Sequence, residues 1–273
     1  MQQLTKQHIA TLLKPRAADS HKGTFGHALL ITGNTYKMGA AVIAARACLR
    51  AGAGLLTVNI PKEERSILQT AVPEAMLSAR EETINYNNFS AVGIGCGIGT
   101  NEPEIVLLEQ LISSCSKPLL LDADALNIIS ANKDLFNKLP ANTVITPHPK
   151  EFDRLFGEHN SVEERRETAV QKAKELNIVI VLKGNQTLIT FNNESYLNTT
   201  GNAGLAKGGS GDALTGTITA LLAQGYTAFD ATQIGVFIHG LAADITLHSQ
   251  SMESMLITDV IEHLGLAFKC MLE

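Results

Sequence analysis

Cysteine is scarce in this chain, and its four copies lie far apart. They stand at positions 48, 96, 115 and 270, and they form neither a CxxC pair nor a spacing typical of zinc ligands. A disulfide framework and a structural zinc site are therefore not indicated. Reduced thiols are typical of proteins inside the cell, so we expect a cytoplasmic location.

Positive charge and long hydrophobic runs are lacking as well. The chain has 22 Lys and Arg residues against 27 Asp and Glu, and this net charge of −5 argues against a general nucleic-acid surface. No apolar run reaches the roughly 18 residues that would span a bilayer, and the opening stretch MQQLTKQHIATLLKPR has no apolar signal-peptide core. We expect neither a nucleic acid nor a membrane as a partner.

The chain does hold enough apolar sequence for one large core. Of its 273 residues, 45% are hydrophobic and 18% are charged. Apolar runs of strand length alternate with longer helical patterns, and the strand-like runs are HALLITG, GLLTVNI, SAVGIG, PLLLD, NTVITP and IVIVLKG. Such strands, separated by helices, predict a mainly parallel central sheet flanked by helices, an α/β sandwich. With no repeat or linker, we expect a single domain over residues 1–273. The charged stretch EHNSVEERRETAVQKAKELN predicts a solvated outer helix.

Glycine is concentrated in GLAKGGSGDALTGTITALLAQG, residues 204–225. The spacing of Leu214, Ile218, Leu221 and Leu222 predicts a helix with one buried face. The glycines and Asp212 therefore lie at the start of that helix, where backbone N–H groups and the helix dipole favour an anion. The alternative is an ordinary N-cap in which Asp212 satisfies first-turn donors.

Two other glycine patterns fail as nucleotide fingerprints. GIGCGIGTN (93–101) has Thr100 where a dinucleotide-binding turn needs its third glycine, and no ribose-binding acid follows about 20 residues later. GHALLITGNTYKMGAA (26–41) lacks the GxxxxGK[ST] arrangement of a P-loop. Both segments can be plain strand-to-helix turns, but turns at the carboxyl ends of parallel strands are also where ligands bind.

Three further strands end in polar side chains capable of chemistry. These residues are Asp122 and Asp124, then Pro147, His148 and Glu151, then Lys183, Gly184 and Thr187. They would gather on one rim of the sheet with the glycine loop, as phosphoryl chemistry requires. Taken singly, each aspartate can serve a turn or cap, and His148 can be a packed histidine.

These motifs together resemble a known family. NAGLAKGGSGDALTGTITALLAQG, TPHPKEFDRLFG, LDADALN and VLKGNQTLI are similar to the ribokinase-like superfamily, and within it to the ADP-dependent NAD(P)H-hydrate dehydratases. The resemblance runs from KGTFGHALLITGN (22–34) to GLAADI (240–245), and TPHPKE makes it specific. Sugar kinases of the superfamily usually show Asn-x-x-Glu where this chain has HPKE. The implied fold is a ribokinase-like three-layer sandwich.

The resemblance implies a repair reaction. NADH or NADPH hydrated at C6 of the nicotinamide ring (S epimer) would be phosphorylated by ADP or ATP and would then lose phosphate. Asp212 would accept the hydroxyl proton, and the helix N-terminus would favour its ionised form. The N–H groups around Gly209, Ser210 and Gly211 would hold the transferred phosphoryl group.

The resemblance also assigns binding residues. The nucleotide would lie along Lys183, Gly184, Asn185, Gln186 and Thr187, and at Gly211. The hydrated dinucleotide would contact Ala40 or Ala41, Gly99, His148 and Asp212. Mg²⁺ would bridge phosphates, with Glu151 as its protein partner through water. The alternative for Glu151 is a first-turn acid after Pro149.

Two other function classes stay open at this point. One is a small-molecule kinase acting on a vitamin precursor or sugar, and the other is a catalytically silent nucleotide-binding regulator, against which Asp212 in an intact glycine loop argues. The preferred nucleotide is not fixed by the sequence, because ADP and ATP present the same phosphates. The apolar helices after residue 226 lead us to expect a homo-oligomer, with a tetramer among the states considered.

Overall fold

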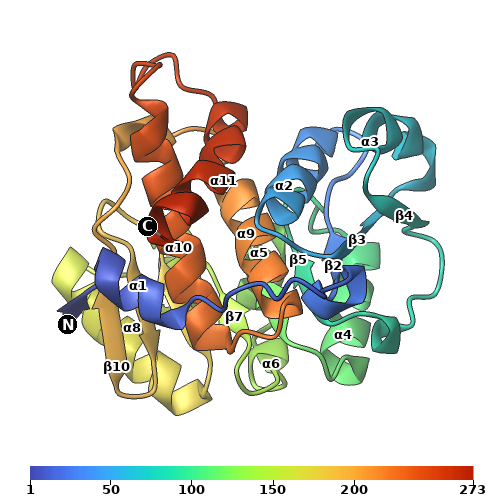
Figure 1. Cartoon of the computed structure of the whole chain (residues 1–273). Coiled ribbons are helices and arrows are strands. Elements are labelled where there is room, and N and C mark those ends of the chain that lie inside the picture. Colours follow the sequence, from blue (N-terminus) through green and yellow to red (C-terminus); the bar gives the residue numbers. More distant parts are fainter. Residues whose placement is uncertain (273) are drawn as a thin grey trace.

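A ten-stranded sheet runs through the molecule in the computed structural model, which describes residues 1–272 (Figure 1). The strand order is β1-β10-β9-β8-β7-β6-β5-β2-β3-β4. Neighbouring strands are parallel, except that β9 is antiparallel to both β8 and β10. The strands are β1 (Gln2–Gln3), β2 (His27–Ile31), β3 (Leu55–Ile60), β4 (Met76–Ala79), β5 (Ala91–Ile94), β6 (Leu119–Leu121), β7 (Val144–Ile145), β8 (Val179–Leu182), β9 (Leu188–Phe191) and β10 (Glu194–Leu197).

Helices cover both faces of this sheet. One face carries α1 (Lys6–Leu12), α2 (Met38–Arg50), α3 (Arg65–Ala71), α9 (Ser210–Ala223), α10 (Ala228–Thr246) and α11 (Ile257–Leu272). The other face carries α4 (Glu102–Ser114), α5 (Asp124–Ala131), α6 (Lys133–Phe136), α7 (Pro149–Phe156) and α8 (Val162–Leu176). Short 3₁₀ turns lie at Lys22–Phe25, Lys62–Glu64, Tyr86–Asn88 and Ala203–Leu205. Two hydrophobic clusters, one for each face, fill the space between helices and sheet, so the predicted three-layer sandwich is confirmed.

The six strand-like runs of the sequence all form strands. The first, HALLITG, gives β2, and the last, IVIVLKG, gives β8, whose four residues are all buried. A strand that is buried on both faces reads as a continuous apolar run, which is why these segments could be recognised. Helix α8 buries only Ala169 and Ala173, as expected for a solvated outer helix.

Helix α9 differs from its prediction. Residues 213–223 are all buried, instead of one face only. The helix is enclosed because it packs against α2 and α10 and against strands β2, β5 and β6. Its threonines tolerate this burial because Thr217 and Thr219 donate to carbonyl oxygens one turn back, at 2.9 and 2.7 Å.

The apolar helix α10 is likewise covered by its neighbours. It lies against α9 and α11 (Figure 1), and most of its residues are buried there. No helix within residues 1–272 is both long and apolar enough to cross a membrane. All four cysteines are free thiols, as the sequence indicated.

Candidate active site

The glycine loop leads directly into the first turn of α9. Gly209 is the N-cap residue and has a left-handed backbone, with φ 96° and ψ −17°, which only glycine adopts without strain. No side chain caps this helix. The Gly211 and Asp212 N–H groups of its first turn are therefore available to a bound anion, whereas the Ser210 N–H donates to the Lys207 carbonyl oxygen at 3.4 Å. The start of α9 thus has the form of the predicted anion site rather than of a side-chain N-cap.

Lys183 places a positive charge beside this helix start. Its Nζ lies 2.8 Å from Asp122 Oδ1, and Thr215 of α9 donates to Asp122 Oδ2 at 2.9 Å. A Cβ on Gly211 would lie 3.4 Å from both Lys183 Nζ and Asp122 Oδ2. Burial lowers the pKa of Lys183, but the charges of Asp122 and Glu151 outweigh it and raise the pKa overall. The ammonium group therefore stays charged next to the first-turn N–H groups, an arrangement suited to phosphate.

Asp212 lies in the first turn of α9, next to this charged group. Burial raises its pKa, a hydrogen bond with the Cys96 thiol lowers it, and the charge of Asp122 raises it further, so the net shift is upward. The net effect of these causes thus favours the neutral form, chiefly because of burial, and the contribution expected from the helix N-terminus stays a prediction. A carboxylate with a raised pKa is a stronger base at neutral pH.

A cavity of about 590 Å³ opens on one side of this site. Five of the six predicted nucleotide residues line it, namely Lys183, Gly184, Asn185, Thr187 and Gly211. Gln186 is exposed and does not line the cavity, and its carbonyl oxygen accepts from Arg166 Nη2 at 3.3 Å instead. Ser210, predicted in the anion site, also lines the cavity.

A second wall of the cavity, formed by the other lining residues, was not predicted. It consists of Asn198, Thr200, Gly201, Asn202, Ala203, Leu205, Ala206, Leu214, Val236, His239 and Gly240. Asp244 of α10 holds this wall in place, because it accepts from the Gly201 backbone N–H at 2.8 Å and from Asn202 Nδ2 at 3.0 Å. The stretch TGNAG just before the glycine loop was the signal available for part of it, whereas nothing in the pattern of α10 marked its residues as cavity-lining.

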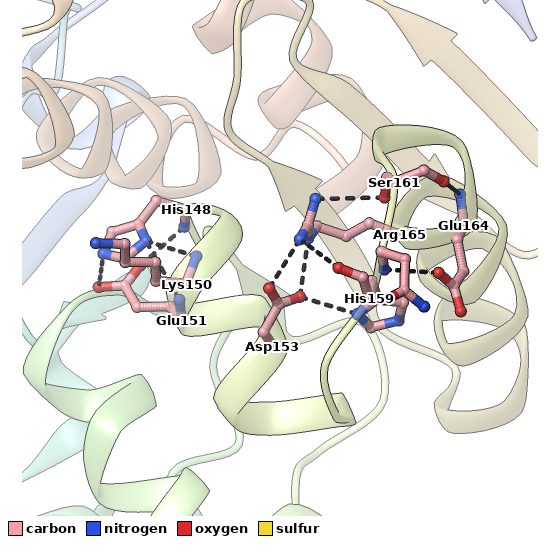
Figure 2. Close-up of polar contacts among 9 residues, drawn as sticks. His148, Lys150, Glu151, Asp153, His159, Ser161, Glu164 and Arg165 are labelled. Atoms are coloured by element: carbon pink, nitrogen blue, oxygen red, sulfur yellow. Dashed lines mark hydrogen bonds and ion pairs between the residues drawn. The ribbon is translucent and has the colours of Figure 1, made fainter.

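His148 and Glu151 form a capping box at the start of α7 (Figure 2). His148 Nδ1 accepts from the backbone N–H groups of Lys150 and Glu151 at 3.1 and 3.2 Å, and Glu151 Oε2 accepts from the His148 N–H at 2.8 Å. His148 also lines the cavity, as Lys183 does. The two residues therefore have the structural roles weighed as alternatives, and His148 keeps a half-exposed ring that a ligand can reach.

Glu151 lies between this cap and the anion site. One of its carboxylate oxygens is 4.0 Å from Lys183 Nζ, and its side chain is 6% exposed. Among residues 1–272, no group of three or more His, Cys, Asp and Glu side chains is placed to hold a metal ion. The magnesium role of Glu151 stays a prediction.

One turn further along α7, Asp153 fastens this helix to α8 (Figure 2). It accepts from Arg165 Nε and Nη2 at 2.8 Å each, and it lies 2.8 Å from His159 Nδ1. The hydrogen bond from Arg165 is the main cause that lowers the pKa of Asp153. This contact supports the helix whose first residues carry His148 and Glu151.

Of the predicted dinucleotide residues, His148 lines the cavity, whereas Ala40, Ala41, Gly99 and Asp212 do not. The Gly99 N–H donates to Asp124 Oδ2 at 2.9 Å, and Asp124 is close enough to raise the pKa of Asp212. Ala40 of α2 is partly exposed and would meet a Cβ on Gly97 at 3.2 Å. Ala41 is fully buried and offers a ligand no surface, so Ala40 is the residue of that pair that can make contact. The charges of Lys183 and Asp124 both act on the pKa of Asp212, so this carboxylate is near a residue that lines the cavity and near the partner of Gly99.

This fold and this site define a class of protein, the ribokinase-like α/β sandwiches. A ribokinase-like superfamily protein from Enterococcus faecalis has the same fold, with a TM-score of 0.88 and 29% identity, covering 99% of this chain and 96% of that one. The family model for NAD(P)H-hydrate dehydratase matches residues 28–265, and the chain belongs to this family.

Named relatives agree with this assignment. An ADP-dependent (S)-NAD(P)H-hydrate dehydratase from Neisseria meningitidis is 37% identical over 257 residues, which is 92% of this chain and 87% of that protein. The ADP/ATP-dependent NAD(P)H-hydrate dehydratase of Bacillus subtilis, crystallised with ATP and Mg²⁺, has a TM-score of 0.87 and 31% identity over 99% of this chain and 98% of its own.

Proposed function

We propose that this chain is a lyase that dehydrates the S epimer of hydrated NADH or NADPH back to NAD(P)H, with ADP or ATP converted to AMP or ADP and phosphate. The observation that carries this proposal is the proximity of Asp212 both to Lys183, which lines the cavity, and to Asp124, which accepts from the Gly99 N–H. A nucleotide in the cavity would present its terminal phosphate to a substrate hydroxyl at Asp212. The family relationship supports the identity of both substrates.

The chemistry follows from these placements. Asp212 accepts the proton of the C6 hydroxyl while the hydroxyl oxygen attacks the terminal phosphorus of the nucleotide. The bond between that phosphorus and the rest of the nucleotide breaks. Lys183 and the first-turn N–H groups of α9 stabilise the charge on the transferred phosphoryl group. The ring nitrogen then supplies electrons that expel phosphate from C6, and loss of the C5 proton restores the dihydronicotinamide. Lys183 fits its role because Asp122 keeps it charged and in place.

Magnesium would be held mainly by the nucleotide phosphates in this scheme. When bound, it would neutralise phosphate charge. Glu151, with a carboxylate oxygen 4.0 Å from Lys183 Nζ, would reach the ion through water, since that oxygen already accepts from the His148 N–H. Asp122 is engaged by Lys183 and Thr215 and is not free to bind metal.

We also propose a homo-oligomer, although fewer of the apolar residues after position 226 can form its interface than the sequence suggested. The apolar residues of α10 are buried within the chain, so they cannot form the interface. Exposed leucines do lie on and before α11, with Leu266 46%, Leu256 58% and Leu272 73% exposed. Light scattering on the purified protein tests this, and a monomer at all concentrations would overturn it.

The proposal also covers the domain organisation, the cellular location and the partners of the chain. One catalytic domain would span residues 1–273, since every described strand belongs to one sheet. The four free thiols support a cytoplasmic location, which cell fractionation tests. Net negative charge argues against nucleic-acid partners, which a filter-binding assay at low salt tests.

The experiment for the reaction uses purified protein, hydrated NADH, Mg²⁺ and either ADP or ATP. Return of absorbance at 340 nm, with one phosphate released per NADH formed, supports the repair reaction. A stable phosphorylated product without absorbance gain would show the small-molecule kinase instead. No turnover of any hydroxyl substrate would identify a silent nucleotide-binding protein.

A further inference from the structure

His239 is a buried histidine whose side chain lacks the partner that burial normally requires. It lies in the interior of α10, is 6% exposed, and lines the 590 Å³ cavity. Its Nε2 is buried and has no hydrogen-bond partner. Buried polar atoms are nearly always hydrogen-bonded, so an unpartnered ring nitrogen at a cavity wall calls for a ligand atom.

The surroundings of His239 are otherwise fixed. The next residue, Gly240, lies so close to Thr200 that a Cβ there would come within 2.4 Å of the threonine hydroxyl. That hydroxyl donates to the Phe237 carbonyl oxygen of α10 at 2.8 Å. Thr200 thus holds α10 at Phe237 and at Gly240, on either side of His239 in the sequence.

We propose that His239 Nε2 hydrogen-bonds the nucleoside part, base or ribose, of the nucleotide bound in this cavity. This inference rests on the proposed nucleotide site. His239 is a binding residue that sets affinity for the nucleoside, and it takes no part in phosphoryl transfer.

Two observations favour the nucleoside over the phosphates. Lys183 and the start of α9 already supply the groups suited to phosphate, whereas His239 directly precedes Gly240, which lies against Thr200. Burial, with a smaller contribution from the charge of Lys183, lowers the pKa of His239 to about 4. A histidine that is neutral at physiological pH cannot offset phosphate charge, but it can donate to or accept from a neutral base or hydroxyl.

The test compares two ligands on matched variants. His239→Leu removes the hydrogen-bonding atom, and His239→Gln returns a polar atom near the position of Nε2. Calorimetric titration with ADP and Mg²⁺ should show a Kd increased about 2- to 12-fold in His239→Leu, as for loss of one neutral hydrogen bond. His239→Gln should recover most of the affinity. Competition by inorganic pyrophosphate, which has no nucleoside, should be unchanged in both.

A thermal melt separates this role from a structural one. Without ligand, His239→Leu should melt at or above the wild-type temperature, because it removes a buried polar atom that has no partner. His263→Leu is the control. His263 Nδ1 lies 3.0 Å from Oγ1 of Thr246, which belongs to α10 as His239 does, and His263 does not line the cavity. It should lower the melting temperature and leave ADP affinity unchanged.

Several outcomes would overturn the inference. An unchanged ADP Kd in His239→Leu would remove His239 from the site, and equal losses for ADP and pyrophosphate would place it at the phosphates. Should the leucine variant fail to fold, the ¹⁵N shift of His239 Nε2 in the wild type must change on ADP addition, and a constant shift contradicts the proposal. Wild-type protein that binds no ADP at all would refute the proposed nucleotide site itself.

Discussion

Lys183 Nζ lies 2.8 Å from Asp122 Oδ1, and this pair stands beside Gly211 at the first turn of α9. Asp122 is 2% exposed and is held from α9 as well, by Thr215 at 2.9 Å. Because burial acts to lower the pKa of Lys183, the carboxylate is what keeps the ammonium charged. The anion site therefore depends on a buried aspartate that need not touch a ligand.

Asp122→Asn tests that dependence. Burial lowers the pKa of Lys183 and the Asp122 carboxylate raises it, so loss of the carboxylate should lower this pKa. The alkaline limb of kcat/KM should then move to lower pH. Removing one partner of a buried pair should also cost about 3 kcal/mol of stability. Glu262→Gln, which breaks the exposed pair with Arg50, is the control and should change stability by less than about 1 kcal/mol. An alkaline limb that stays in place would show that Asp122 does not govern Lys183.

Gly211→Ala tests the anion site with little strain. The new methyl group would lie 3.4 Å from Lys183 Nζ and Asp122 Oδ2, an ordinary contact distance, but it would occupy space that the transferred phosphoryl group needs. We expect a melting temperature near that of the wild type and a rate reduced about 10-fold or more. Gly208→Ala, where a Cβ meets nothing within 4 Å, should retain activity. Equal activity in both variants would mean that the loop is only a turn. Gly209→Val is less informative, since φ is 96° and a Cβ there would meet Ile43 at 2.8 Å.

His148 requires variants that separate its cap from its ligand contact. His148→Ala removes the acceptor for two backbone N–H groups and should cost about 1 kcal/mol of stability, whereas His148→Asn can still cap α7. If the ring also contacts the hydrated dinucleotide, KM for the hydrate should rise in both variants, about 2- to 100-fold, with ADP affinity nearly unchanged. Hydrate KM, calorimetric ADP affinity and melting temperature decide this. Recovery of every property in His148→Asn would leave the cap as the histidine's role.

Asp153→Asn addresses the support of α7. The pKa of Asp153 is lowered in the folded protein, chiefly by its hydrogen bond with Arg165. The stabilising contribution of Asp153 is therefore complete above the usual aspartate pKa near 3.8. It is lost as the pH falls through the lower pKa that Asp153 has in the folded protein. The variant should be less stable than the wild type at pH 7 by about 1 to 3 kcal/mol, and the difference should shrink at strongly acidic pH. Denaturant melts at both pH values measure this, and a difference that does not depend on pH would contradict the ion pair's role.

The sequence predicted those parts of the site that depend on local pattern. The buried parallel strands, the helix after Asp212, and Lys183 and His148 at strand ends could be read because strand direction brings such ends to one edge. The cavity lining from Thr200 and α10 could not, because Thr200 meets Phe237 and Gly240 only through the tertiary packing of a mostly buried helix. Pairing of Asp122 with Thr215, 93 residues apart, is likewise set by tertiary packing.

Asp212→Asn is the most direct test of the central claim that this carboxylate is the base. The variant keeps size and hydrogen bonding but cannot take the proton, so turnover of hydrated NADH at 340 nm should fall about 10²-fold or more. ADP affinity should change little. In the wild type, burial raises the pKa of Asp212 above its usual 3.8, so activity should be lost as pH falls through a value higher than this. A variant within a few-fold of the wild-type rate, or with the same acid limb, would contradict the assignment.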